Sequence, residues 1–204
     1  MTTALSLVVA YLLGSIPFAY LFGRRSGVDI RAVGDRNVGA FNVFRHVGLT
    51  AGIGTLAADA GKGALAVVVA RALSGDMFVV FLAGGAAVAA HNWPVFLHFR
   101  GGRGAATAVG ILLILLPREM SISLGLATIA LWMTRNSLYF SSMLFILVPL
   151  FCWLFGETLA LLTYSVALPC VVGLTHWIRV RRLPLEARKE AKTFWVLRRT
   201  GHNH

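Results

Sequence analysis

Long apolar segments alternate with short polar ones along almost the whole chain. The apolar segments run approximately over residues 4–22, 51–72, 77–97, 105–117, 121–134, 138–155 and 158–178. A helix of about 20 apolar residues is long enough to cross the hydrocarbon core of a bilayer. The pattern therefore predicts an all-α integral membrane protein with about seven transmembrane helices. The fourth and fifth segments are short, and either could be re-entrant or cross only in part.

The composition favours the same fold class. The chain of 204 residues is 57% hydrophobic and only 13% charged, and its mean hydropathy is +0.75. A soluble domain of this length would carry more charge. We expect residues 1–204 to form a single transmembrane domain with a basic cytoplasmic tail over about residues 179–204. The first segment lacks the basic leader and cleavage site of a signal peptide, so we expect it to remain as the first span.

The net charge of +11 does not indicate a nucleic-acid partner, because the basic residues lie between apolar segments and in the tail. That distribution is typical of membrane orientation and of anionic lipids or substrates. Cys152 and Cys170 both lie in apolar segments and are interpreted as small buried hydrophobes. We expect neither a disulfide framework nor a metal site.

The basic residues also predict an orientation. With seven spans and the N-terminus outside, the outer segments hold only two arginines, Arg71 and Arg118. The inner segments hold the basic tail and Arg24, Arg25, Arg31, Arg36, Arg45, Arg100, Arg103 and Arg135. This asymmetry satisfies the positive-inside rule. The C-terminus and every candidate anion-binding segment are therefore predicted to face the cytoplasm.

Residues 91–104, HNWPVFLHFRGGRG, join an apolar segment to a glycine-rich turn with two arginines. Glycine lets a backbone bend sharply and approach a ligand, and backbone N–H groups before a helix form a ready anion site. Arginine matches the oxygens of a phosphate. The alternative is an ordinary cytoplasmic loop whose arginines only orient the protein. The candidate residues of the turn are Arg100, Gly101, Gly102, Arg103 and Gly104.

Two further segments carry polar candidates. Asp59 and Lys62 lie inside the second apolar segment, on one helical face, where they could form a structural ion pair or contact a substrate. The segment GDRNVGAFNVFR at residues 34–45 holds two asparagines and a closing arginine that could clamp phosphate, although alone it could be an ordinary capped loop. No catalytic serine or metal motif is present.

Several segments together resemble the bacterial membrane acyltransferases that acylate glycerol 3-phosphate from an acyl phosphate. The family's motif GSGNxGATN, followed by an arginine, corresponds to GDRNVGAFN at residues 34–42 and then Arg45. The motif DxxKG is found at residues 59–63. The long motif GHxFPVFLxFKGGKGVAT is found as AHNWPVFLHFRGGRGAAT at residues 90–107, and HxxNIxRL appears in outline as HWIRVRRL at residues 176–183.

The resemblance implies a seven-span protein of the cell membrane with its active site on the cytoplasmic side. It would transfer an acyl group from acyl phosphate to the sn-1 hydroxyl of glycerol 3-phosphate, giving lysophosphatidic acid and phosphate. No cofactor and no acyl-carrier or coenzyme A thioester would be used. The implied partners are the two substrates and the lipid bilayer, with no obligatory protein partner.

The resemblance also implies roles for residues. Arg45 and Arg103 would clamp phosphate and His176 would hold the acceptor, which makes these three the candidate catalytic residues. No side chain stands out as an obligatory base, and the acceptor's own phosphate could take the proton. The candidate substrate-binding residues are Asp35, Asn37, Gly39, Asn42, Lys62, His91, Arg100, Gly101, Gly102, Gly104, Thr107 and Arg179.

The chain departs from the family motifs at Asp35, Arg36, Phe41, Arg100, Arg103 and Arg179. A carboxylate at Asp35 would repel a phosphate unless Arg36 or another cation neutralises it. Two alternatives therefore stay open: a divergent enzyme that acylates a different acceptor, and a non-catalytic membrane protein that binds phosphate or phospholipid. A transporter is less well supported, because the sequence has no internal repeat and its polar groups cluster on one face.

Overall fold

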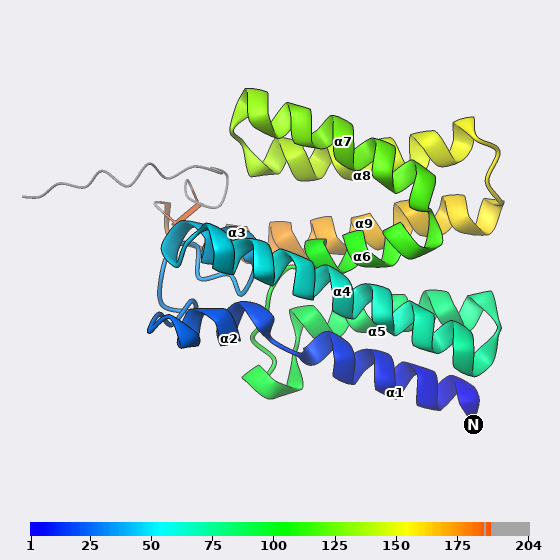
Figure 1. The fold of residues 1–204 in the computed structure, drawn as a ribbon, viewed down its shortest axis with the longest axis horizontal. Helices are drawn as coiled ribbons and strands as arrows, with labels where there is room; N and C mark the ends of the chain where they lie inside the picture. Colours follow the sequence, from blue (N-terminus) through cyan, green and yellow to red (C-terminus); the bar gives the residue numbers. More distant parts are fainter. Residues whose placement is uncertain (186, 189–204) are drawn as a thin grey trace, which may run out of the picture.

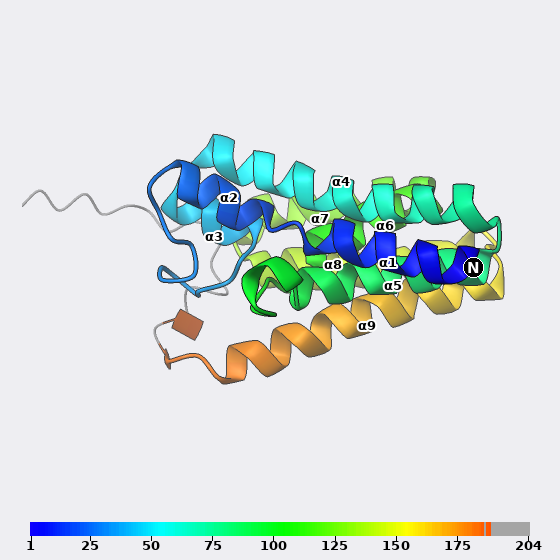
Figure 2. The same ribbon diagram turned by 90° about the horizontal axis from the view of Figure 1, so that it is seen from below.

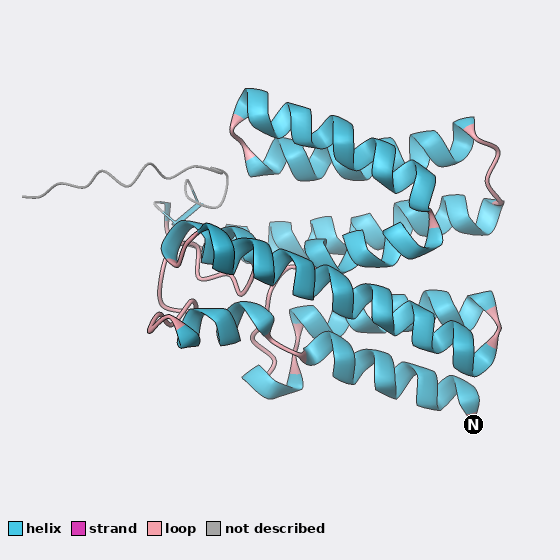
Figure 3. Cartoon of the chain, in the orientation of Figure 1, coloured by secondary structure: helices cyan, strands magenta, loops and turns pink. Residues whose placement is uncertain are grey.

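The computed structural model describes residues 1–185, 187 and 188, and these residues fold into helices joined by short loops (Figures 1 and 3). The helices are α1 Thr2–Ser15, α2 Phe18–Arg25, α3 Ala40–His46, α4 Leu49–Ser74, α5 Met77–Asn92, the 3-10 helix η1 Val95–Leu97, α6 Ala105–Leu115, α7 Pro117–Thr134, α8 Ser137–Leu154 and α9 Leu159–Arg181. The prediction of an all-α chain is confirmed for the described residues.

Among the described residues, five helical stretches are long and apolar enough to cross a membrane: Thr2–Arg25, Leu49–Ser74, Met77–Leu97, Ser137–Leu154 and Leu159–Arg181. Helix α6 is apolar but shorter, and α7 carries two charged residues in its first turn. The described chain is therefore that of an integral membrane protein.

The long helices lie roughly along one common axis in two views turned by 90° (Figures 1 and 2). The loop after α2, the turn before α6 and the last turn of α9 all gather at one end of the bundle. The N-terminus lies at the opposite end. The polar segments that carry the candidate residues thus come together although they are far apart in the sequence.

Small residues bring the central helices close together. A Cβ atom at Gly110 of α6 would lie 1.8 Å from the carbonyl oxygen of Ala60 in α4, and one at Gly63 of α4 would lie 2.2 Å from the carbonyl oxygen of Thr107. Apolar helices in lipid gain little from hydrophobic burial against one another, so close packing of small residues provides much of their attraction. This packing places α4 directly beside α6.

Proline residues explain two differences from the predicted spans. The first span is broken: α1 ends at Ser15 and α2 begins at Phe18, because Pro17 has no N–H group to continue the helix. The third span ends as an α-helix at Asn92, two residues before Pro94, since the residue before a proline is disfavoured in the helical conformation.

Three further expectations are corrected. The segment at residues 34–45, for which an ordinary capped loop was one alternative, is helical from Ala40, where α3 begins. Helix α7 begins at Pro117, so Arg118 and Glu119 lie in its first turn instead of between two spans. Cys152 is buried as expected, but Cys170 is exposed on the surface of α9.

The basic tail that the sequence predicts over residues 179–204 begins inside a helix, because α9 continues to Arg181. The part of the predicted tail beyond residue 188 lies outside the described residues.

Candidate active site

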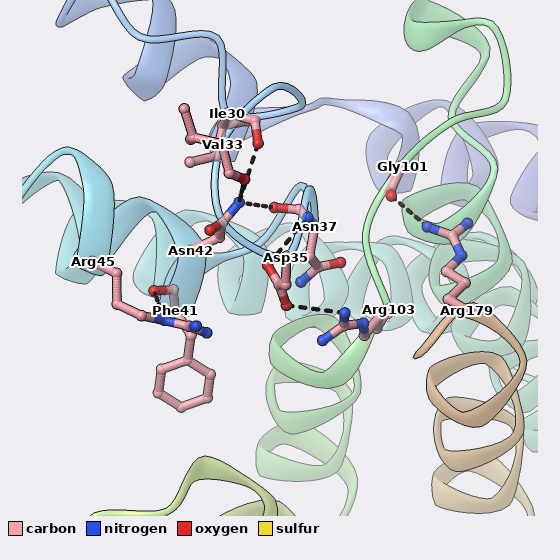
Figure 4. A network of polar contacts seen from close by, with 10 residues as sticks. All are labelled: Ile30, Val33, Asp35, Asn37, Phe41, Asn42, Arg45, Gly101, Arg103 and Arg179. Atoms are coloured by element: carbon pink, nitrogen blue, oxygen red, sulfur yellow. Dashed lines mark hydrogen bonds and ion pairs between the residues drawn. The ribbon is translucent and has the colours of Figure 1, made fainter. Parts of the chain in front are cut away.

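A single asparagine holds the first polar loop in shape (Figure 4). The Nδ2 group of Asn42 donates to the carbonyl oxygens of Ile30, Val33 and Asn37, each at 3.1 Å. Asn42 is fully buried on α3, so these bonds form away from solvent, where an unpaired amide would be costly. Asn42 therefore holds the loop together, which is a structural role beside the substrate binding expected of it.

The loop held by Asn42 carries Asp35 to the glycine turn. One carboxylate oxygen of Asp35, Oδ2, lies 2.9 Å from a terminal nitrogen of Arg103, and Oδ1 accepts the backbone N–H of Asn37 at 3.2 Å (Figure 4). The side chains of Asp35 and Arg103 are only 1% and 11% exposed. Burial lowers the pKa of Arg103, and the ion pair with Asp35 opposes that shift. The cation that neutralises Asp35 is therefore Arg103.

Arg179 ties α9 to the same turn. Its guanidinium donates to the carbonyl oxygens of Gly101 and Asn92, which lie on either side of the 3-10 helix. Asn92 also donates to the hydroxyl of Thr175, one turn earlier on α9, at 3.4 Å. The two bonds of Arg179 join residues 78 and 87 positions apart in the sequence, and they make Arg179 a structural partner of the turn as well as a residue of the site.

The glycines of the turn are required by contacts within the protein. A Cβ atom at Gly101 would lie 2.2 Å from the carbonyl oxygen of His91, and one at Gly102 would lie 2.1 Å from Nε2 of His91. Gly104 has φ +79°, a conformation that favours glycine. The close approach predicted for this turn is therefore real, but it is an approach to the protein's own backbone and side chains.

The expected use of backbone N–H groups is wrong for two of these glycines. The N–H of Gly101 donates to the carbonyl oxygen of Asn92 at 3.1 Å, and that of Gly102 donates to the carbonyl oxygen of His91 at 3.0 Å. Neither group is available to cradle a phosphate in this conformation.

An open pocket of about 230 Å³ lies where the first loop, the glycine turn and the end of α9 meet. We call it the arginine pocket, because four arginines line it. Its lining residues are Asp35, Arg36, Asn37, Arg103, Arg179, Arg182 and Leu183. Four guanidinium groups around one carboxylate leave the pocket strongly positive, which suits an anionic ligand.

A second group of polar side chains lies deeper, between α4, α5 and α6. We call Asp59, Lys62, His91 and Thr107 the inner polar cluster; all four are buried. Lys62 Nζ lies 2.8 Å from Asp59 Oδ1 and donates to the carbonyl oxygen of Ile16 at 2.8 Å. His91 Nδ1 lies 3.2 Å from the hydroxyl oxygen of Thr107 and 3.7 Å from Asp59 Oδ1.

The inner polar cluster borders a narrow cavity of about 10 Å³, enough for roughly one water molecule. Lys62, His91, Gly101 and Gly102 are among its lining residues. The break in the first span explains one of the contacts: Ile16 lies between α1 and α2, and its carbonyl oxygen accepts from Lys62 as well as from the backbone N–H of Phe18.

The remaining predicted residues lie around these two sites. His176 is half-buried on α9, one turn before Arg179, and is close enough to Arg103 and Asp35 for their charges to act on it. Arg45 donates from Nε to the carbonyl oxygen of Phe41 at 3.1 Å (Figure 4).

Among the described residues, neither Arg45 nor His176 belongs to the lining of the arginine pocket. Arg100 is exposed, and Gly39 is buried at the start of α3.

Three residues at the site are not among the candidates predicted from the sequence. They are Arg36 and Arg182 in the pocket and Asn92 beside Arg179. Arg182 could have been found, since it follows Arg179 by three positions and helical residues with that spacing lie on one face. No local signal marks the backbone carbonyl of Asn92, because its role depends on α9.

The comparisons with known proteins agree with this geometry. The sequence model described as glycerol-3-phosphate acyltransferase matches residues 4–185. Glycerol-3-phosphate acyltransferase 4 of Dehalococcoides mccartyi is 43% identical over 179 residues, which cover 87% of this chain and 97% of that relative. The glycerol-3-phosphate acyltransferase of Dinoroseobacter shibae is 40% identical over 180 residues, which cover 85% of this chain and 83% of that relative.

Among solved structures, the chain resembles the crystal structure of PlsY (YgiH), an integral membrane glycerol 3-phosphate acyltransferase, in its glycerol 3-phosphate form. The TM-score is 0.82 at 31% sequence identity, and the match covers 92% of this chain and 94% of that one. The lysophosphatidic acid form of the same protein matches with a TM-score of 0.80. The family match spans nearly all of the described chain, and the chain therefore belongs to the glycerol-3-phosphate acyltransferase family.

Proposed function

We propose that this protein transfers an acyl group from an acyl phosphate to the sn-1 hydroxyl of glycerol 3-phosphate, giving lysophosphatidic acid and phosphate. The observation that carries the proposal is the arginine pocket, an open polar site at one end of an apolar helical bundle. Both substrates are phosphate compounds, and one of them carries a long acyl chain. A cationic pocket beside lipid-facing helices suits both requirements.

The reaction needs little chemistry from the protein, because an acyl phosphate is already a reactive mixed anhydride. The acceptor hydroxyl oxygen attacks the acyl carbonyl carbon, and the bond from that carbon to the phosphate oxygen breaks. The proton of the hydroxyl passes to a phosphate oxygen, so no side-chain base is required. The protein then contributes mainly position and positive charge around two anions.

We further propose seven membrane-crossing helices, with the 11-residue α6 as the shortest crossing, and with the arginine pocket facing the cytoplasm. The support is the distribution of arginines, which the positive-inside rule places in the cytoplasm. Cysteine accessibility tests this proposal: a cysteine placed at Arg36 should react with an impermeant thiol reagent only in inside-out vesicles. Labelling in right-side-out vesicles would contradict it.

A second candidate function is acyl transfer to a different acceptor. It is favoured by Asp35, which places a carboxylate in the wall of the arginine pocket. A carboxylate repels a phosphate placed beside it, but it accepts hydrogen bonds from the hydroxyl or amine groups of an uncharged or cationic acceptor. Competition among acceptors separates the two candidates: glycerol 3-phosphate should support transfer far better than glycerol or an amino alcohol if the first is right.

The decisive experiment measures phosphate release by the purified protein in lipid, with palmitoyl phosphate and with or without glycerol 3-phosphate. We expect release that requires the acceptor and that falls roughly 100-fold or more in Arg103→Ala, because the change leaves the Asp35 carboxylate unpaired in the pocket, where it repels the substrate phosphates. Arg135→Ala, at the same end of the bundle but outside the pocket, is the matched control.

Folded wild-type protein that releases no phosphate would overturn the proposal. Single variants of Asp59, His91 and His176 test the proposal that no side chain acts as a base. If one of them loses nearly all kcat while KM is unchanged, a protein base exists and that part of the mechanism is wrong.

A further inference from the structure

We infer that Asp35 and Arg36 act as a pair in which Asp35 neutralises Arg103 while Arg36 supplies the charge that binds a substrate phosphate. Arg36 would thus be a specificity-determining residue of the arginine pocket. The inference rests on the proposed function, because it assumes that the pocket's ligand is a phosphate monoester.

Two of the four arginines in the pocket are already held by the protein. Arg103 lies 2.9 Å from the Asp35 carboxylate, and that carboxylate is almost completely buried beside it. Arg179 donates to the backbone carbonyl oxygens of Gly101, in the glycine turn, and of Asn92, at the end of α5. Both guanidinium groups therefore already use hydrogen-bond donors on acceptors within the protein, which leaves fewer donors for a ligand.

Arg36 differs from both. It is exposed and lines the pocket, and its guanidinium has no hydrogen bond or ion pair with any described residue. Its neighbour Asp35 is occupied by Arg103 and by the N–H of Asn37. Arg36 is therefore the cation of this loop that is free to meet an anion.

The backbone conformation of Arg36 supports the same role. Arg36 has φ +54°, a left-handed conformation that costs a residue with a side chain about 1 kcal/mol and costs glycine little. Its backbone N–H donates to the carbonyl oxygen of Val33 at 3.0 Å, which closes the tight turn. An arginine at a position better suited to glycine weakens the fold slightly, and a ligand contact would account for its presence.

The charges in the arginine pocket indicate which class of ligand it binds. The Asp35–Arg103 pair is close to neutral as a unit, whereas Arg36 adds a full positive charge with a forked donor at the open side of the pocket. A phosphate monoester, with up to two negative charges and three acceptor oxygens, matches such a donor. The phosphate of glycerol 3-phosphate and that of the acyl phosphate share this chemistry.

The test is a double-mutant cycle between Asp35→Ser and Arg36→Gly. Arg36→Gly should relieve the backbone strain and raise the melting temperature, yet raise KM on the order of tenfold because a charge-assisted hydrogen bond is lost. In the double variant, Arg103 is released from Asp35 and can bind the phosphate, so KM should return to within roughly threefold of the wild-type value.

Arg135→Gly is the matched control, because Arg135 has the same φ of +54° and lies outside the pocket. It should leave KM unchanged, which separates the loss of the Arg36 side chain from the removal of an arginine with a left-handed backbone elsewhere. Determining KM separately for glycerol 3-phosphate and for palmitoyl phosphate identifies which phosphate Arg36 holds. Calorimetric titration with glycerol 3-phosphate gives a binding measurement that does not depend on turnover.

The inference and the proposed function fail in different ways. If the wild type binds glycerol 3-phosphate and Arg36→Gly weakens that binding while no transfer is seen, the function fails and the inference stands. If Arg36→Gly changes neither binding constant nor KM, or if Asp35→Ser does not rescue it, the inference is overturned. Wild-type protein that binds neither glycerol 3-phosphate nor palmitoyl phosphate also overturns it.

Discussion

The arginine pocket and the inner polar cluster both contain charged side chains, but they differ in how completely those charges are paired. The inner polar cluster lies between apolar helices, and its charges pair with one another: Lys62 reaches the carboxylate of Asp59 and the carbonyl of Ile16. The arginine pocket is open at the end of the bundle, and its four cations face a single carboxylate. One site compensates its charge internally and the other keeps a surplus.

The difference separates structural charge from ligand-binding charge. An ionised group inside a membrane protein is costly unless it is paired, so the pair of Asp59 and Lys62 is what makes burial of either one tolerable. The cavity beside it holds about one water molecule, too little for a phosphate. For Lys62 this favours the structural ion pair over substrate contact, the two roles that the sequence left open.

Breaking the inner pair should have the largest effect on stability. Lys62→Met leaves the buried carboxylate of Asp59 without its cation, and we expect a loss of about 3–5 kcal/mol in the free energy of unfolding. Thermal or denaturant unfolding in detergent measures the change. The double variant Asp59→Leu with Lys62→Met should recover most of the loss, since no unpaired charge remains.

The same double variant also tests whether Lys62 contacts the substrate. If Lys62 is structural, the folded double variant should keep kcat/KM within several-fold of the wild-type value. A recovered fold with activity reduced by a factor of 100 or more would assign Lys62 to the substrate instead.

The glycine turn joins the two sites, and Gly101→Ala should disturb both. The added methyl group would meet the carbonyl oxygen of His91 and the ring of Pro94, so we expect a loss of about 1–3 kcal/mol and a weakened arginine pocket. Gly61→Ala is the matched control, because a Cβ there meets nothing within 4 Å. It should leave activity unchanged and stabilise α4 by about 0.5–1 kcal/mol. Equal effects of the two changes on stability would contradict this account of the turn.

Arg179→Met tests the link between α9 and the turn. It leaves the carbonyl oxygens of Gly101 and Asn92 without this donor, at a cost of about 1–2 kcal/mol. Because the turn positions Arg103, KM should rise as well. Arg181→Met, on the same helix beside Trp177, is the control and should leave KM unchanged. A change in stability with an unaltered KM would limit Arg179 to a structural role.

The smallest effect is expected at an exposed pair outside both sites. The hydrogen bonds and charge of Arg31 lower the pKa of Asp29 to about 2. Because the folded pKa lies below the ordinary value, the pair stabilises the protein above about pH 4, and this contribution is lost as the pH falls towards 2. Asp29→Asn should lower the melting temperature only slightly at neutral pH, as is usual for surface pairs, and the difference should shrink at pH 3. A difference that grew on acidification would contradict the assignment.

Local sequence was sufficient for the long apolar helices and for their order along the chain. Runs of apolar residues mark the membrane-crossing stretches, since hydropathy and length depend only on neighbouring residues. The ends of the helices were less predictable. Pro17 interrupts the first apolar segment, but only the structure shows that one helix stops at Ser15 and another begins at Phe18. The motifs also identified most of the polar residues that gather at one end of the bundle.

The pairing of those residues was decided by tertiary structure. No spacing within the sequence indicates that Asp35 meets Arg103, that Arg179 bonds to the carbonyl of Gly101, or that the N–H groups of the turn are already used. Such contacts join segments brought together by helix packing, and each one changes how much charge is left for a ligand. The sequence by itself determined which charges this protein carries and at which end of the membrane helices they lie. Only the fold decided which of them neutralise one another, because a charge in a protein acts through its nearest partners in space.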